Sequence, residues 1–320
     1  AAYNQAAIAL PAALVGDLVS PGPERSHALA VQQTMMSCGQ ALGPLIQLIF
    51  MLVTDSDNWT LASLHVVLMT GLIFFFLGLP FVWRMPRGPF AGGKHADPPR
   101  VSGEGPWWVI PMILEVSFVV TMLGSGMTFK FWPLFFKEDY NLNPAEVCAV
   151  NLSMWLGIAV MARISPFLGQ AVGVLPAALL LHMGGCALTF VITKVYPLPW
   201  VITLVILRSG LMNASTPLLQ SLIMDKVPER HRGKWTSVMT LKRMTWSGSA
   251  FIGGLLSDSH DYRYAFAITS VVHVASGLLI VPVMFLQGRA PAPPPVCVAS
   301  ATPLDTSMQP VQGEDQRAER

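Results

Sequence analysis

The feature that most constrains this chain is a succession of long apolar stretches along most of its 320 residues. A helix needs about 20 apolar residues to cross the hydrocarbon core of a bilayer. Eight stretches reach that length and one at the start is partial; they cover residues 1–16 (partial), 28–53, 60–83, 107–129, 145–163, 174–193, 199–224, 235–256 and 264–286. Only 12% of the residues are charged, whereas soluble domains carry about 25%. The pattern predicts an all-α integral membrane protein embedded in a lipid bilayer.

Charges in the connecting loops predict the orientation of these spans. Alternate loops carry ten basic residues, which are Arg25, Arg84, Arg87, Lys94, Arg100, Arg163, Lys226, Arg230, Arg232 and Lys234. The other loops carry three, Lys137, Lys194 and Arg263, together with Asp55, Asp57, Glu138, Asp139, Asp258 and Asp261. Basic loops stay in the cytoplasm. We therefore predict that residues 17–27, 84–105, 163–173, 225–234 and the tail after 287 are cytoplasmic, and that 55–58 and 138–143 lie outside.

Several classes of function find no support in the sequence. The four cysteines (Cys38, Cys148, Cys186 and Cys297) are far apart, which argues against a zinc site and a disulfide framework. The sequence holds no GxxxxGK[ST] loop, no histidine cluster and no basic tract interleaved with aromatic residues. ATP-driven pumping, membrane-enzyme chemistry and nucleic-acid binding are therefore not expected. We expect no metal and no cofactor.

Two loops predicted to be cytoplasmic resemble each other and indicate an internal repeat. The first reads GDLVSPGPERSHALA and contains Asp17 and Arg25; the second reads MDKVPERHRGKWTS and contains Asp225, Arg230, Arg232 and Gly233. An offset of 208 residues aligns the two loops, and it also aligns the apolar segments before them without a gap. Repeated six-helix halves are a known architecture of secondary transporters.

At this point the chain resembles the major facilitator superfamily of secondary transporters. Residues 225–233 resemble that family's loop between helices 10 and 11, residues 246–254 followed by Asp258 resemble its helix 11 and exit, and residues 140–144 resemble the loop after helix 7. Residues 166–173 occupy the place of its degenerate signature loop, with Gln170 where the family usually has Asp. In helix 5, Gly39 to Pro44 is interpreted as a small-residue face for helix packing.

The resemblance implies an arrangement of halves. The chain would comprise the end of helix 4 and helices 5 to 12, with 1–83 as the remainder of the first half, 84–105 as the linker and 106–286 as the second half. The tail, 287–320, is rich in Pro, Ser, Gln and charge and is expected to be disordered. The chain begins inside an apolar segment without Met, so we expect a chain truncated at its N-terminus.

The function implied is transport of a small-molecule substrate by alternating access, by uniport or with a coupling proton or ion. The alternative is a transporter-like receptor or scaffold, or an inactive truncated product. Neither the substrate nor the cellular membrane follows from the sequence.

Charged residues at membrane depth are the candidates for substrate binding or coupling. At about 1.5 Å per helical residue, Glu115, Arg208 and Arg243 all lie near the middle of the bilayer. Ser215, seven positions after Arg208, falls on nearly the same helix face. A charge at this depth is costly and tends to face a cavity or a partner. Glu115 and Arg208 would therefore either form a packing salt bridge or line the substrate path, and Arg208 is expected to face the central cavity. His65, His182 and His273 are interpreted as satisfied interior histidines.

Overall fold

The computed structural model describes residues 14–16, 18–54, 61–84 and 106–287, and it contains ten named helices in these ranges. They are α2 (Pro23–Thr54), α3 (Leu61–Trp83), α4 (Val109–Phe129), α5 (Trp132–Tyr140), α6 (Pro144–Val172), α7 (Val174–Ile192), α8 (Leu198–Lys226), α9 (Glu229–Ser259), α10 (Tyr262–Leu278) and α11 (Val281–Gln287). Six of the described segments are long and apolar enough to cross a membrane, and α3 and α9 occupy two further predicted spans. The expected all-α membrane fold is confirmed. Residues 1–13 of the predicted first span lie outside the described residues.

The structure adds detail to two predicted spans, and at each place a new helix begins with a proline in its first turn. The span predicted at 107–129 is followed by a second helix, α5, with Pro133 in its first turn. The span predicted at 264–286 divides into α10 and α11, and Pro282 lies at the start of α11. Proline has no backbone N–H and its ring clashes with the carbonyl four residues earlier, so it favours the first turn of a helix.

Local sequence signals fix the ends of α6 and α10. The Asn143 side chain accepts a hydrogen bond from the Glu146 backbone N–H, and the Glu146 side chain accepts one from the Asn143 N–H. This capping box, with Pro144 following it, starts α6. At its other end, Gly173 adopts a φ of 95°, a value that favours glycine. Asp261 caps α10 by accepting from the Tyr264 N–H at 2.5 Å.

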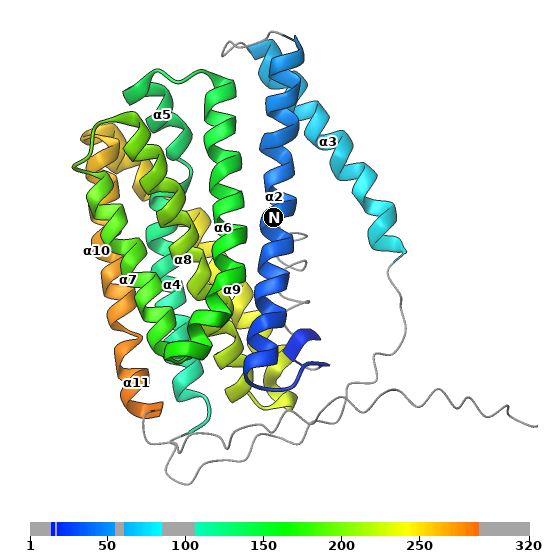
Figure 1. The fold of residues 1–320 in the computed structure, drawn as a ribbon, viewed down its shortest axis with the longest axis vertical. Coiled ribbons are helices and arrows are strands. Elements are labelled where there is room, and N and C mark those ends of the chain that lie inside the picture. The colour runs from blue at the N-terminus through cyan, green and yellow to red at the C-terminus, as the bar shows by residue number, and fades with distance from the viewer. Residues whose placement is uncertain (1–13, 17, 55–60, 85–105, 288–320) are drawn as a thin grey trace, which may run out of the picture. The chain divides into compact units, whose positions relative to one another are not determined.

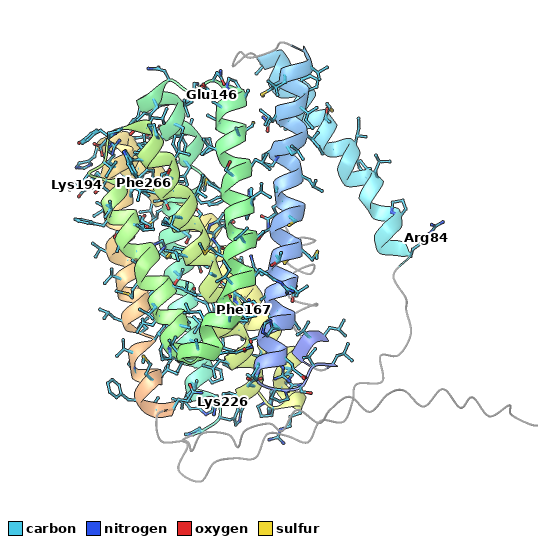
Figure 2. The ribbon with its side chains drawn as sticks, viewed as in Figure 1. Arg84, Glu146, Phe167, Lys194, Lys226 and Phe266 are labelled. Atoms are coloured by element: carbon cyan, nitrogen blue, oxygen red, sulfur yellow. The ribbon has the colours of Figure 1, made fainter. Side chains whose placement is uncertain are left out.

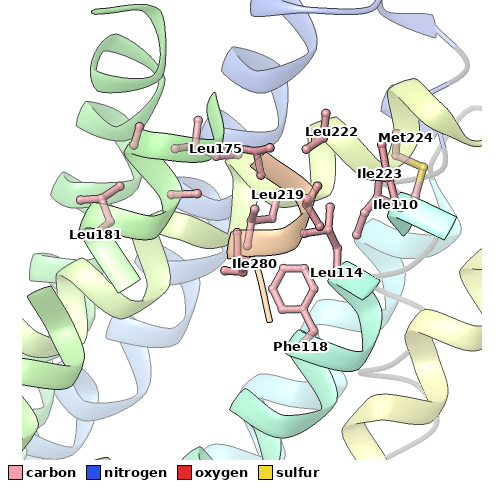
Figure 3. Close-up of a cluster of buried hydrophobic side chains, with 14 of the residues drawn as sticks. Ile110, Leu114, Phe118, Leu175, Leu181, Leu219, Leu222, Ile223, Met224 and Ile280 are labelled. Atoms are coloured by element: carbon pink, nitrogen blue, oxygen red, sulfur yellow. The ribbon is translucent and has the colours of Figure 1, made fainter. Parts of the chain in front are cut away.

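The helices after the linker form one bundle, the C-terminal bundle (α4–α11), and α2 lies along it against α6 (Figure 1). Within the bundle, α8 packs on α6 and α7, while α4 packs on α9 and α10. In one buried cluster, Leu114 and Phe118 of α4 lie against Leu219 of α8 and Ile280 (Figure 3). By contrast, α3 contacts little besides α2 and exposes apolar side chains such as Leu68.

The two ends of the bundle differ in charge. We call the end where α2 and α9 begin and α8 ends the basic end, and the opposite end, where α6 begins, the acidic end. Figure 2 shows Lys226 at the basic end, and Glu146 and Lys194 at the acidic end. The acidic end also carries Glu138, Asp139, Asp258 and Asp261.

Two glycines allow α4 and α9 to approach each other closely. A Cβ atom added to Gly253 of α9 would lie 2.3 Å from the carbonyl oxygen of Met127. A Cβ added to Gly126 of α4 would lie 2.1 Å from the carbonyl oxygen of Trp246. Real Cβ atoms do not approach backbone so closely, so this packing requires glycine on both helices. By contrast, Gly39 and Gly43 of α2 have no described atom within 4 Å of such a Cβ, so the packing role suggested for them remains a prediction.

Candidate functional site

The basic end holds a cluster of charged contacts between α2 and the C-terminal bundle. Arg25, near the start of α2, is completely buried. Its Nη1 donates to the Asp225 carboxylate at 2.5 Å. Its Nη2 donates to the carbonyl oxygens of Gly16 and Val19, at 2.9 and 2.8 Å, and its Nε donates to Val19 O at 3.2 Å. One guanidinium therefore joins the chain before α2 to the end of α8.

A second arginine completes this cluster from α9. Arg232, 3% exposed, donates from Nη1 to Gly16 O at 2.9 Å, so the Gly16 carbonyl accepts from both arginines. Because opposite charges in a buried pair compensate each other's desolvation, the cluster of Arg25, Asp225 and Arg232 holds the basic end together. We refer to it as the basic-end lock.

The structure therefore unites three of the six residues that the repeat singled out. Arg230 is exposed, so it does not share in the buried lock. Gly233 is part of α9, but its surroundings lie outside the described residues, as does Asp17.

Side-chain contacts between α2 and α6 extend the lock. The Gln170 amide nitrogen lies 2.8 Å from His27 Nε2, and the His27 ring meets Phe167 edge-on at 5.2 Å between centroids. Further along α2, the Thr34 hydroxyl contacts the Ala159 carbonyl oxygen at 3.4 Å. Figure 2 shows Phe167 on the part of α6 nearer the basic end. Gln170 therefore makes a neutral contact where the resemblance would place a carboxylate.

Arg208 and Glu115 do not form the packing salt bridge that was one of the two alternatives for these charges. Arg208 of α8 donates from Nε to the Thr189 hydroxyl of α7 at 3.0 Å, and its Nη2 has no hydrogen-bond partner among the described residues. Its side chain thus contacts α7 inside the C-terminal bundle, and its orientation toward the central cavity stays a prediction. Glu115 lies on α4 and is 2% exposed. Depth along a helix placed both charges near mid-membrane, but it did not fix the direction in which each side chain points.

The other predicted site residues fare differently. The Ser215 hydroxyl donates to the Met212 carbonyl of its own helix at 2.9 Å, so it is satisfied locally and does not extend the Arg208 contact. The side chain of Arg243 lies outside the described residues.

The interior histidines belong to a polar network that sequence reasoning did not assemble. His182 Nε2 of α7 lies 2.8 Å from the Ser276 hydroxyl and 3.0 Å from the His273 carbonyl oxygen of α10. His273 Nε2 lies 3.3 Å from the Thr121 carbonyl oxygen of α4, while its Nδ1 has no partner among the described residues. His182 is thus interior and hydrogen-bonded, as predicted. His65 is exposed on α3, so the interior interpretation fails there.

An aromatic cavity also lies in the part of the bundle nearer the acidic end. It measures about 50 Å³ and is lined by Phe129, Trp132, Pro133, Phe136, Val147, Val150, Asn151 and Met154. Phe129 packs against Trp155 of α6 and Trp246 of α9, each at 5.9 Å between centroids. The sequence signal for this site was weak, because its residues come from three helices and apolar aromatics are common throughout the spans.

These helices and the charged contacts between α2 and the bundle define a multi-pass membrane protein. The chain belongs to the Major Facilitator Superfamily: the model of that family matches residues 4–241 and, in an overlapping match, residues 114–309. The resemblance drawn from its motifs is thereby confirmed, and the family supports a role in membrane transport.

One solved structure with a similar fold is that of the human organic anion transporter MFSD10 (TETRAN). The likeness has a TM-score of 0.62 at 18% sequence identity, and it covers 85% of this chain and 67% of the MFSD10 chain. At this identity the likeness shows the fold. No curated protein matches the sequence significantly.

Proposed function

We propose that this protein transports a small solute across a membrane by alternating access, as a uniporter or an ion-coupled secondary carrier. Residues 1–83 and 106–286 would belong to two halves that rock against each other, with 84–105 as the linker. The observation that carries the proposal is the basic-end lock. Arg25 lies in the first copy of the repeated loop and is bound to Asp225 in the second copy. A contact of this kind closes one end of the path and must break for the other state to form.

The orientation and the solute path follow from the same proposal. The basic end faces the cytoplasm, because basic loops are retained there. Solute would pass near the aromatic cavity, where Asn151 offers an amide beside Phe129 and Trp132. Organic anions are the first class to test, since the structurally similar MFSD10 is an organic anion transporter. Glu115 is the candidate for a coupling proton, and Ser215 and Arg243 remain candidates for solute contact.

Uptake by the full chain in proteoliposomes tests the proposal. The panel contains organic anions, organic cations and neutral solutes, each measured with and without a pH gradient. We expect saturable uptake of at least one solute, above that of protein-free vesicles. If no solute in the panel enters faster than in those vesicles, the transport proposal fails and a receptor or scaffold role is favoured.

Glu115→Gln tests whether transport is coupled to protons. Because the amide cannot release a proton at this position, we expect the variant to lose accumulation driven by a pH gradient. Exchange of labelled for unlabelled solute should stay within about twofold of the wild type, since exchange needs no net proton movement. Equal loss of accumulation and exchange would instead assign Glu115 to solute binding or to structure.

A further inference from the structure

The guanidinium of Arg208 lies deep inside the C-terminal bundle. It is the eleventh residue of α8, so it lies about 15 Å along the helix from the acidic end. The residue is 5% exposed. Its Nε donates to Thr189 Oγ1 at 3.0 Å, and its Nη2 has no hydrogen-bond partner among the described residues. A permanent positive charge is therefore buried with part of its donor edge unused.

No carboxylate of the described helices balances this charge. The acidic residues of the described chain lie near helix ends, with the exception of Glu115, which Arg208 does not contact. The titratable groups that interact electrostatically with Arg208 are Cys186, His182 and His273. A thiol or a neutral imidazole supplies no negative charge. A charge at bilayer mid-depth is costly, so a compensating negative charge stabilises this arrangement.

Neutral hydrogen-bond partners would not remove that cost. The Thr189 hydroxyl donates its own hydrogen to the Gly185 carbonyl at 2.8 Å, so toward Arg208 it acts as an acceptor and holds the guanidinium in place. A water molecule at Nη2 would accept its hydrogen bond. It would leave the positive charge uncompensated, and the charge is the larger cost.

We propose that Arg208 holds a small monovalent anion, a halide or a carboxylate, inside the C-terminal bundle beside α7 and α10. The guanidinium edge that carries Nη2 is the binding group, and Thr189 is a positioning residue. The site should prefer a monovalent anion, because a divalent anion beside a single guanidinium would leave a net charge in a medium of low polarity. Such a site goes beyond the proposed function, since it requires no transport.

Anion-dependent stability of the purified full chain in detergent tests the site. Thermal unfolding is measured in chloride, acetate and gluconate at constant pH and ionic strength. A ligand that binds only the folded state raises the melting temperature in a saturable way. We expect chloride or acetate to raise it by several degrees relative to the bulky gluconate. Equilibrium binding of radioactive chloride and acetate should reach about one anion per chain.

Three variants assign the effect to Arg208. Arg208→Met, which removes the charge at similar length, should abolish the anion response. Arg263→Met should keep it, because Arg263 lies near the acidic end beside Asp139 at 3.6 Å. Thr189→Val keeps the charge but loses the acceptor for Nε, and should weaken anion affinity by about tenfold. This variant keeps the test decisive if Arg208→Met does not fold.

The pattern of responses separates the sources of the anion. A response to chloride alone assigns an inorganic halide, and a response to acetate alone assigns a carboxylate such as an organic solute carries. A response to both supports a site for either anion. Equal melting temperatures in all three salts without binding of either labelled anion would overturn the proposal, as would an unchanged response in Arg208→Met. Neither readout depends on uptake, so these results are independent of whether a transported solute is found.

Discussion

Arg25→Glu is expected to lower solute uptake by at least about tenfold relative to the wild type. The variant places a second carboxylate against Asp225, where the wild type has an ion pair at 2.5 Å between the fully buried Arg25 and a carboxylate that is 22% exposed. Breaking a fully buried pair costs about 3–5 kcal/mol; for this partly exposed pair a loss of about 1.4 kcal/mol is enough to change an equilibrium about tenfold. The closed basic end would thus become rare, and a carrier must pass through both states in every cycle. Uptake of the solutes found with the proteoliposome panel measures the effect.

Two further variants make this prediction specific. Arg163→Glu changes an exposed charge near the basic end of α6, so its uptake should stay within about twofold of the wild type. The double variant Arg25→Glu, Asp225→Arg restores a pair of opposite charges. It does not restore the hydrogen bonds that Arg25 donates to the carbonyl oxygens of Gly16 and Val19. We therefore expect partial rescue. Wild-type uptake by Arg25→Glu, or a double variant no better than the single one, would contradict the role of the lock.

Gly253→Ala is expected to destabilise the protein strongly, because the added methyl group would lie 2.3 Å from the Met127 carbonyl oxygen. Overpacking costs about 1–3 kcal/mol, and more when backbone must move. In a chain of this size the melting temperature should fall by roughly 5 °C or more. Unfolding of the purified protein in detergent, followed by tryptophan fluorescence, gives the value.

The matched control for this variant lies on the same helix. A Cβ at Gly248 would meet nothing within 4 Å among the described residues, and alanine favours helices by about 1 kcal/mol over glycine. Gly248→Ala should therefore unfold at the same temperature as the wild type or slightly above it. Equal melting temperatures for the two variants would show that α4 and α9 do not pack through their backbones at this point.

The sequence predicted the spans, and the repeat singled out residues of the lock, but no contact between those residues was predicted. Apolar length identifies each helix directly, and the repeat brought Arg25 and Asp225 into equivalent loops before any contact was known. Arg208 lies within α8, as the spans implied, but the sequence did not identify Thr189 as its neighbour. Its partner is Thr189, because the azimuth of α8 in the bundle is set by packing on α6 and α7. A single sequence without that packing determines depth in the membrane and leaves direction open.

The aromatic cavity and the histidine network were missed for a related reason. Each is assembled from residues on three helices, as with Thr121, His182 and His273. No spacing along one helix reveals such a set. The close contact of the two glycines at the crossing of α4 and α9 is likewise recognised only once the helices are placed together.

The central claim is that the two ends open and close in opposition, and distances between spin labels test it most directly. One pair joins Glu24 of α2 to Lys234 of α9 at the basic end, and the other joins Val53 of α2 to Glu146 of α6 at the acidic end; all four positions are exposed. The labels are placed in the full chain in nanodiscs, in a background without native cysteines.

Pulsed electron paramagnetic resonance then compares the wild type with Asp225→Asn, which weakens the lock. We expect the variant to gain a longer distance at the basic end and a shorter one at the acidic end. Distributions that stay the same at both ends, or that lengthen at both together, would contradict alternating access controlled by Arg25 and Asp225.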